Sequence, residues 1–151
     1  MIMKIGIFYA TYSGGTQMAS EFLAEKLKSL GHEVTLKQIS EISFDETLTY
    51  DLRVFTSPSW DNESEEGQPH IDFISFIQKS AGKNFSGKPC AVFGLGDSTY
   101  AHFCGAVDIV TDYIKKNGGK IIINPLKIDG YLFNTEANNK LLSDWASKLK
   151  V

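Results

Sequence analysis

The stretch Ile5-Gly-Ile-Phe-Tyr-Ala-Thr-Tyr-Ser-Gly-Gly-Thr-Gln-Met-Ala-Ser-Glu-Phe22 decides the fold of this chain. An apolar run passes through a short loop of hydroxyl residues and glycines into a helical pattern. Such a loop directs backbone N–H groups and the partial positive charge of the helix N-terminus at one point. Hydroxyl groups there can donate hydrogen bonds to an anion, and glycines let the backbone approach it closely. These residues are Thr11, Ser13, Thr16, Gly14 and Gly15. The loop therefore predicts a phosphate site.

Two familiar phosphate signatures are missing from this loop. It has no Gly-Lys-Ser/Thr ending, and no G-x-G-x-x-G follows the first apolar run, which excludes a P-loop and a Rossmann dinucleotide site. It also has no Lys or Arg, so a bound phosphate would stay close to doubly negative. The alternative interpretation is an ordinary capped helix, with Ser13 or Thr16 as the capping residue.

Length and composition narrow the class of protein. The chain has 151 residues, which predicts one domain over 1–151, and 42% of them are hydrophobic, which argues against disorder. The net charge of −3 argues against a nucleic-acid partner. No apolar run approaches the ~20 residues of a membrane span, and no signal peptide precedes the first strand, so we expect a cytoplasmic protein. Cys90 is expected to be a buried thiol, and the two cysteines lack disulfide or metal spacing.

Five apolar segments alternate with helical patterns along the chain. Parallel strands need helical crossovers, so the alternation predicts a parallel sheet between two helical layers, an α/β fold. The second segment alternates with polar residues and is expected at an edge, which gives the strand order 2-1-3-4-5. The loops after strands 1, 3 and 4 then converge on one crevice. The expected strands are 3–9, 34–39, 52–58, 89–94 and 120–128, and the helical stripes are 19–30, 71–77, 106–114 and 137–149, with at most a short helix in 40–51.

Two aromatic residues are expected beside the phosphate loop. Trp60 follows strand 3, and Tyr100 follows strand 4 together with Gly94, Gly96 and Asp97. A flat aromatic ring that carries a phosphate on a short arm would fit between them, since stacked aromatic pairs gain ~0.5–1.5 kcal/mol beyond burial. The alternatives are that Trp60 is a core residue under a long loop and that Tyr100 only caps the sheet.

Three segments resemble the flavodoxin family. Thr11-Tyr-Ser-Gly-Gly-Thr16 is similar to its phosphate loop, and Thr56-Ser-Pro-Ser-Trp60 is similar to the loop that sets an aromatic on the inner flavin face. Gly96-Asp-Ser-Thr-Tyr-Ala-His-Phe-Cys-Gly-Ala-Val-Asp108 is the most specific match, and in the family its Tyr covers the outer flavin face. The resemblance covers the whole chain. Because no long insertion interrupts the fifth strand, it implies a short-chain member with a three-layer α/β/α flavodoxin-like fold.

The resemblance implies non-covalently bound flavin mononucleotide (FMN) as the cofactor. This chain departs from the family at Gly15, where Asn is usual, and at Asp61, where Gly is frequent; we expect the second departure to change the redox tuning of the flavin. The residues implied to bind FMN are Thr11, Tyr12, Ser13, Gly14, Gly15, Thr16, Ser57, Pro58, Ser59, Trp60, Asp61, Leu95, Gly96, Asp97, Tyr100, Phe103 and Cys104.

The segment between Val54 and Gln78 contains five acidic residues and no Lys or Arg. Negative charge near a flavin opposes its reduction, and an acidic rim steers basic partner surfaces. We therefore expect a low-potential one-electron carrier that is a monomer and serves a flavoprotein reductase and an acceptor enzyme. The acids are Asp61, Glu63, Glu65, Glu66 and Asp72.

Two other functions compete with the carrier. An FMN-dependent quinone reductase of the same fold would need a substrate pocket, and no insertion that could build one is apparent. A response-regulator receiver would need an acidic residue after strand 1 and an Asp after strand 3, where this chain has Thr11 and Ser57. No catalytic triad, metal cluster or acid–base pair is apparent, and His70 and His102 are interpreted as surface residues.

Overall fold

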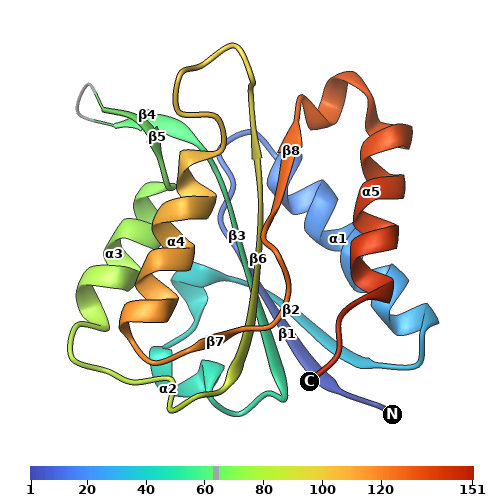
Figure 1. Ribbon diagram of the computed structural model, residues 1–151, viewed down its shortest axis with the longest axis vertical. Helices are drawn as coiled ribbons and strands as arrows, with labels where there is room; N and C mark the ends of the chain where they lie inside the picture. Colours follow the sequence, from blue (N-terminus) through green and yellow to red (C-terminus); the bar gives the residue numbers. More distant parts are fainter. Residues whose placement is uncertain (63–64) are drawn as a thin grey trace.

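A parallel sheet with helices on both faces forms three layers (Figure 1). The computed structural model describes residues 1–62 and 65–151. The strands are β1 (Lys4–Tyr9), β2 (Glu33–Gln38), β3 (Leu52–Pro58), β4 (Trp60–Asn62), β5 (Glu65–Gln68), β6 (Pro89–Gly96), β7 (Lys120–Ile121) and β8 (Leu126–Asp129). The helices are α1 (Gly15–Ser29), α2 (Phe44–Thr47), α3 (Ile71–Lys79), α4 (Gly105–Lys116) and α5 (Thr135–Ser147), with 3₁₀ turns η1 (Ile39–Glu41) and η2 (Tyr131–Phe133). Helices α1 and α5 cover one face, and α3 and α4 cover the other.

The strand order confirms the prediction for the first four strands, and two short strands take the place of the predicted fifth. The order is β2-β1-β3-β6-β7, β8 also pairs with β6, and all of these pairs are parallel. The predicted order 2-1-3-4-5 is therefore correct, except that two short strands take the fifth place. The half-buried strand β2 lies at the edge, as its alternating pattern predicts. None of the helices in the described ranges is long and apolar enough to cross a membrane.

The fifth strand is interrupted because its sequence is longer than the ladder beside it. Cys90 pairs with Ile121 and Phe93 pairs with Leu126, so three steps along β6 face five steps along the partner. The two extra residues bulge out around Pro125, which has no N–H to give to the ladder. The indole of Trp145 compensates in part, because its Nε1 donates to the carbonyl of Asn124 at 3.1 Å.

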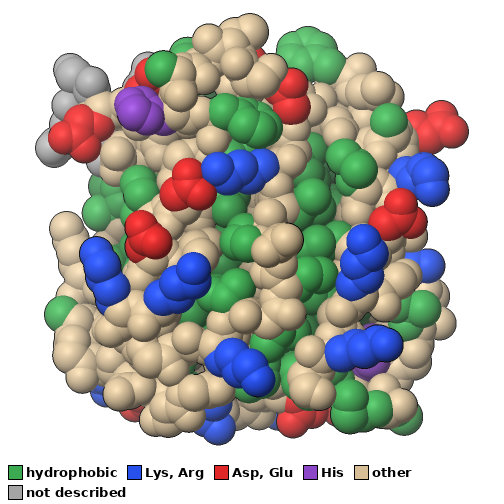
Figure 2. Space-filling view, viewed as in Figure 1, with side chains coloured by type: hydrophobic (Ala, Val, Ile, Leu, Met, Phe, Trp, Pro, Cys, Tyr) green, Lys and Arg blue, Asp and Glu red, His purple; other side chains and the backbone are tan. Residues whose placement is uncertain are grey.

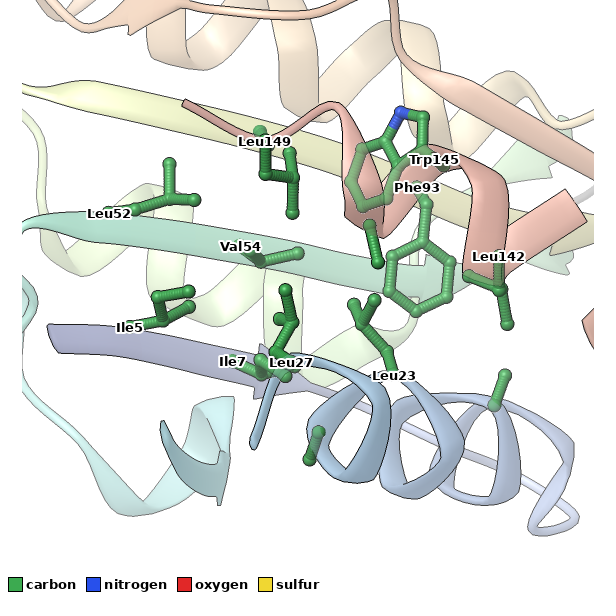
Figure 3. Packing of buried hydrophobic residues seen from close by; sticks show 14 of the residues in the cluster. Ile5, Ile7, Leu23, Leu27, Leu52, Val54, Phe93, Leu142, Trp145 and Leu149 are labelled. Atoms are coloured by element: carbon green, nitrogen blue, oxygen red, sulfur yellow. The ribbon is translucent and has the colours of Figure 1, made fainter. Parts of the chain in front are cut away.

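Apolar side chains fill both spaces between the sheet and the helices. Figure 3 shows the side with α1 and α5, where strand and helix side chains point toward one another. Fully burying one such side chain stabilises the fold by about 1.5–3 kcal/mol. The side with α3 and α4 is rich in aromatic rings, and the ring of Phe55 lies within 6.2 Å of four further phenylalanine rings. The labelled residues of the first cluster are Ile5, Ile7, Leu23, Leu27, Leu52, Val54, Phe93, Leu142, Trp145 and Leu149.

The single arginine of the sequence lies inside this core. Arg53 is fully buried in β3, and its guanidinium group donates to three backbone carbonyls. Nε reaches Thr47 at 2.8 Å, Nη1 reaches Pro89 at 2.8 Å, and Nη2 reaches Tyr50. Burial lowers the pKa of Arg53 from its ordinary value. The side chain thus joins the turn after α2 to the start of β6, at the edge of the sheet opposite the crevice.

Candidate FMN site

A cavity of about 430 Å³ lies where the carboxyl ends of the central strands meet. Its volume is within the range of about 300–1,000 Å³ that is usual for small-molecule sites. The loops after β1, β3 and β6 all contribute to it, at the upper edge of the sheet in Figure 1. The predicted site residues that line it are Thr11, Tyr12, Ser13, Gly15, Thr16, Pro58, Ser59, Trp60, Leu95, Gly96, Asp97, Tyr100 and Cys104.

The loop after β1 forms an anion cradle at the start of α1. Gly14 is the residue that precedes the helix, with a φ of 93° in the left-handed region, where glycine is favoured. Its N–H donates to the hydroxyl of Thr11 at 2.9 Å, which leaves the hydroxyl proton of Thr11 free to point at a ligand. Thr16 lines the cavity while only 2% of its surface is exposed. No side chain caps this helix, so the alternative of a cap by Ser13 or Thr16 is wrong.

The two predicted aromatic residues both face the cavity. The Trp60 and Tyr100 side chains are each 55% exposed and both line it. Trp60 is therefore not a core residue, which argues against that alternative. Two hydrogen bonds hold the backbone that precedes Trp60 in place. The N–H of Ser59 donates to the carbonyl of Leu95 at 3.0 Å, and the hydroxyl of Ser59 accepts from the N–H of Ala106 at 3.0 Å.

The loop that carries Tyr100 is held by carboxylates. Asp129, at the end of β8, accepts hydrogen bonds from the N–H of Ser98 at 2.9 Å and from its hydroxyl at 2.6 Å. Asp97 accepts from the N–H and the hydroxyl of Thr99. These two hydrogen bonds hold the pKa of Asp97 below its ordinary value, so a negative charge stays on the cavity wall.

Gly14, Ser57 and Phe103 are predicted site residues that lie outside the cavity lining, and Asp61 lies in β4, where the structure describes its backbone. Gly14 supports the cradle through its N–H. The hydroxyl of Ser57 accepts from the N–H of His70 at 2.9 Å and is buried. Phe103 packs against the core on the side of α3 and α4. Their contact with a cofactor stays a prediction.

The structure adds cavity residues that the sequence analysis missed. Most come from the loop after β8, which ends at the same edge of the sheet as the three loops considered; the rule that ligands bind at the carboxyl ends of the strands could have found it. Gly130 takes a φ of 56° there and directly precedes η2. The added lining residues are Glu66, Gly67, His102, Gly130, Tyr131, Leu132 and Phe133.

The surroundings of Gly15 do not require a glycine at this position. A Cβ added at Gly15 would lie 3.6 Å from Leu95 and 3.7 Å from Leu132, which is ordinary contact. The φ of Gly15 is helical, so glycine is not required there. The departure from the family therefore removes one donor from the cradle without any steric reason in this fold.

His70 is not a surface residue, which corrects the sequence interpretation. It is only 7% exposed and precedes α3, where its Nδ1 accepts from the N–H of Asp72 at 3.0 Å. Its ring stacks on Tyr12 at 3.9 Å, and it also hydrogen-bonds the backbone of Thr11. This burial depends on Tyr12, 58 positions earlier in the chain, so no local sequence pattern predicts it. His102 is exposed, as expected, and lines the cavity.

Protonation of His70 is expected to destabilise the protein at mildly acidic pH. Burial lowers the pKa of His70 from 6.5, although Asp72 and the Thr11 hydrogen bond oppose the shift. Between this lowered pKa and about 6.5 the unfolded chain binds more protons than the folded chain. The free energy of unfolding therefore decreases as the pH is lowered through that window. Asparagine is a good capping residue that does not titrate. We expect a shallower loss of stability below pH 6.5 in His70→Asn, measured by urea unfolding; parallel pH profiles would contradict the assignment.

The thiol of Cys104 is not suited to nucleophilic chemistry. It is fully buried, and burial raises the pKa of Cys104 to about 12. The residue has a φ of 51° and precedes α4, with its sulfur 3.8 Å from the carbonyl of Ile128. Its position favours a structural role in the cavity wall.

The acids of the segment after β3 have different environments. Glu65 is exposed, Glu66 is half-buried in the cavity wall, and Asp72 lies 3.7 Å from His70. Glu63 lies outside the described residues. Figure 2 shows Lys side chains over the middle and lower parts of the drawn face, while the top edge shows acidic and hydrophobic side chains. Of the described residues that line the cavity, the charged ones are Glu66 and Asp97.

A doubly wound parallel sheet with an anion cradle and two exposed aromatic walls at its carboxyl edge defines the class of flavodoxin-like α/β proteins. The family model described as Flavodoxin matches residues 7–140. The chain belongs to the flavodoxin family, which confirms the resemblance seen in the sequence. A flavodoxin from Maridesulfovibrio salexigens is 37% identical over 125 residues, with 82% of this chain and 84% of the relative covered. A probable flavodoxin 2 from Bacillus subtilis is 34% identical, with 83% and 82% covered.

Solved structures agree with the fold. Oxidised flavodoxin 2 from Bacillus cereus superposes with a TM-score of 0.85 at 29% identity, with 95% of each chain covered. A Fusobacterium nucleatum flavodoxin bound to flavin mononucleotide superposes with a TM-score of 0.82 at 21% identity, with 97% of this chain and 96% of that chain covered. The second likeness supports the fold alone.

Proposed function

We propose that this chain is a low-potential one-electron carrier that holds FMN non-covalently between Trp60 and Tyr100. One observation carries the proposal: a single cavity joins an anion cradle to two exposed aromatic walls. Flavodoxins are electron-transfer proteins rather than enzymes, which favours the carrier over a quinone reductase and over a receiver domain.

The cradle suits the phosphate of FMN. Hydroxyl groups at Thr11, Ser13 and Thr16 can each donate a hydrogen bond, and the N-terminus of α1 adds its partial positive charge. The described lining contains no Lys or Arg. The cradle therefore binds the phosphate without neutralising it, and its negative charge stays close to the cavity.

The aromatic walls suit the ring system. When bound, FMN supplies the electron-transfer chemistry. Trp60 and Tyr100 would cover its two faces and exclude water, and the main chain at Gly96 would meet its polar edge. The sites proposed to contact FMN are those that the sequence analysis named.

Acidic side chains on the wall are proposed to lower the reduction potential. A negative charge near the ring opposes its reduction, because the added electron brings like charges together. About 1.4 kcal/mol corresponds to ~59 mV in a one-electron potential. Asp97 and Glu66 lie on the cavity wall and are placed to act in this way.

The proposal includes transient partners of opposite charge. A flavoprotein reductase and an acceptor enzyme would approach the exposed edge of the cavity, steered by the acidic rim, and the carrier would act as a cytoplasmic monomer. The exposed aromatic side chains at the cavity mouth would provide the apolar part of these contacts.

Electron delivery by a reductase is expected to slow as salt is added. Raising ionic strength from about 0.01 to 1 M shortens the Debye length from about 30 to 3 Å, so steering by the acidic rim is lost. We expect the rate of flavin reduction by an NAD(P)H-dependent flavoprotein reductase to fall about tenfold or more. Photoreduction needs no protein partner and serves as the control. A reductase rate that stays flat across this range, or NAD(P)H turnover without a reductase, would contradict the proposal.

A further inference from the structure

Two segments that carry the aromatic walls are tied to each other directly. The hairpin β4–β5 carries Trp60, and the loop between β6 and α4 carries Tyr100. Within the hairpin, one carboxylate oxygen of Glu66 accepts a hydrogen bond from the N–H of Ala101 at 2.9 Å. Ala101 follows Tyr100 directly, so this bond reaches from one wall to the backbone of the other.

Close backbone packing supports the same connection. Gly67 takes a φ of 76°, and a Cβ added there would lie 2.7 Å from the Cβ of His102. A Cβ added at Gly105 would lie 2.5 Å from the carbonyl oxygen of Gly67. The hairpin therefore lies directly against the loop, and at these points neither backbone can move inward. A further hydrogen bond joins the residue before the hairpin to the start of α4, because the hydroxyl of Ser59 accepts from the N–H of Ala106.

We propose that Glu66 is a positioning residue, which sets the separation of Trp60 and Tyr100 by holding the Tyr100 loop against the hairpin through the N–H of Ala101. The inference rests on the proposed function, since the slot is the proposed flavin site. It assigns to Glu66 an effect through geometry in addition to its charge. Because the chain itself makes this hydrogen bond, the slot would be preorganised, and binding would not have to order both walls.

Three variants separate geometry from charge. Glu66→Gln keeps a carbonyl oxygen that can accept from Ala101 and removes the charge, whereas Glu66→Ala removes both. Glu65→Ala removes the same charge from the exposed neighbouring position and is the matched control.

The first measurement uses the protein without FMN. Amide hydrogen exchange at Ala101 is expected to be about tenfold slower in wild type than in Glu66→Ala, because the hydrogen bond must open before exchange. Protection should persist in Glu66→Gln and in Glu65→Ala. Equal exchange at Ala101 in wild type and Glu66→Ala would overturn the inference.

The second measurement is the dissociation constant for FMN. We expect binding about tenfold weaker in Glu66→Ala, and within about twofold of wild type in Glu66→Gln and Glu65→Ala. Equal weakening in Glu66→Gln and Glu66→Ala would show an effect of charge and overturn the inference. If wild type did not bind FMN at all, the proposed function would fail, and the exchange data alone would then decide whether Glu66 holds the loop.

Discussion

Arg53→Met is expected to lower the free energy of unfolding by about 3 kcal/mol. Each buried carbonyl that loses its donor costs about 1–3 kcal/mol, and three carbonyls lose one here. Relief of the desolvated charge offsets part of this cost, because burying a charge is itself unfavourable. For a chain of this size the change corresponds to a melting temperature lower by roughly 6–12 °C. Urea and thermal unfolding of the variant measure it.

Lysine at position 53 separates charge from geometry. Arg53→Lys keeps the positive charge, but a single ammonium group lacks the planar fork that reaches carbonyls in three directions. We expect this variant to be destabilised as well. Lys79→Met changes an exposed residue at the end of α3 and should stay within about 0.5 kcal/mol of wild type. If the unfolding midpoint of Arg53→Met were as close to wild type as that of Lys79→Met, the buried guanidinium group of Arg53 would contribute nothing to stability.

Riboflavin is expected to bind at least about a thousandfold more weakly than FMN. Riboflavin lacks the phosphate, and each charge-assisted hydrogen bond in the cradle is worth about 1.5–3 kcal/mol. Loss of the several donors around Gly14 and the start of α1 amounts to at least about 4 kcal/mol, and every 1.4 kcal/mol is tenfold in affinity. Titration of the apoprotein with each flavin measures the ratio.

Variants in the cradle test the origin of this preference. Thr16→Val removes one hydroxyl from a side chain of nearly the same shape, and Ser13→Ala removes another. Both should weaken FMN binding and leave riboflavin binding nearly unchanged, so the ratio between the two flavins falls. Equal affinities of wild type for FMN and riboflavin would place the phosphate outside the cradle.

The architecture could be predicted because it depends on regular patterns. Continuous apolar runs predict buried parallel strands, and the polar alternation in 34–39 predicts the edge position of β2. The strand order then brings three loops to one edge without any knowledge of side-chain contacts. Thirteen of the seventeen predicted site residues line the cavity for this reason.

Features that depend on distant contacts could not be predicted in the same way. The hairpin β4–β5 has neither a clear alternation nor an apolar run, and it is held by packing of Gly67 against the loop before α4. His70 is buried where Tyr12 stacks on it, and Arg53 is buried where it meets three carbonyls from two segments that are distant in the sequence. Each case needs tertiary structure, which overrides the local preference of a polar residue for solvent.

Titration of the apoprotein with FMN, followed by flavin fluorescence, tests the central claim most directly. If the ring lies between the indole of Trp60 and the phenol of Tyr100, we expect nearly complete quenching with a sharp end point at one FMN per chain. Quenching should weaken in a Trp60→Ala, Tyr100→Ala double variant. Fluorescence that stays at the level of free FMN in the wild-type protein would contradict the account.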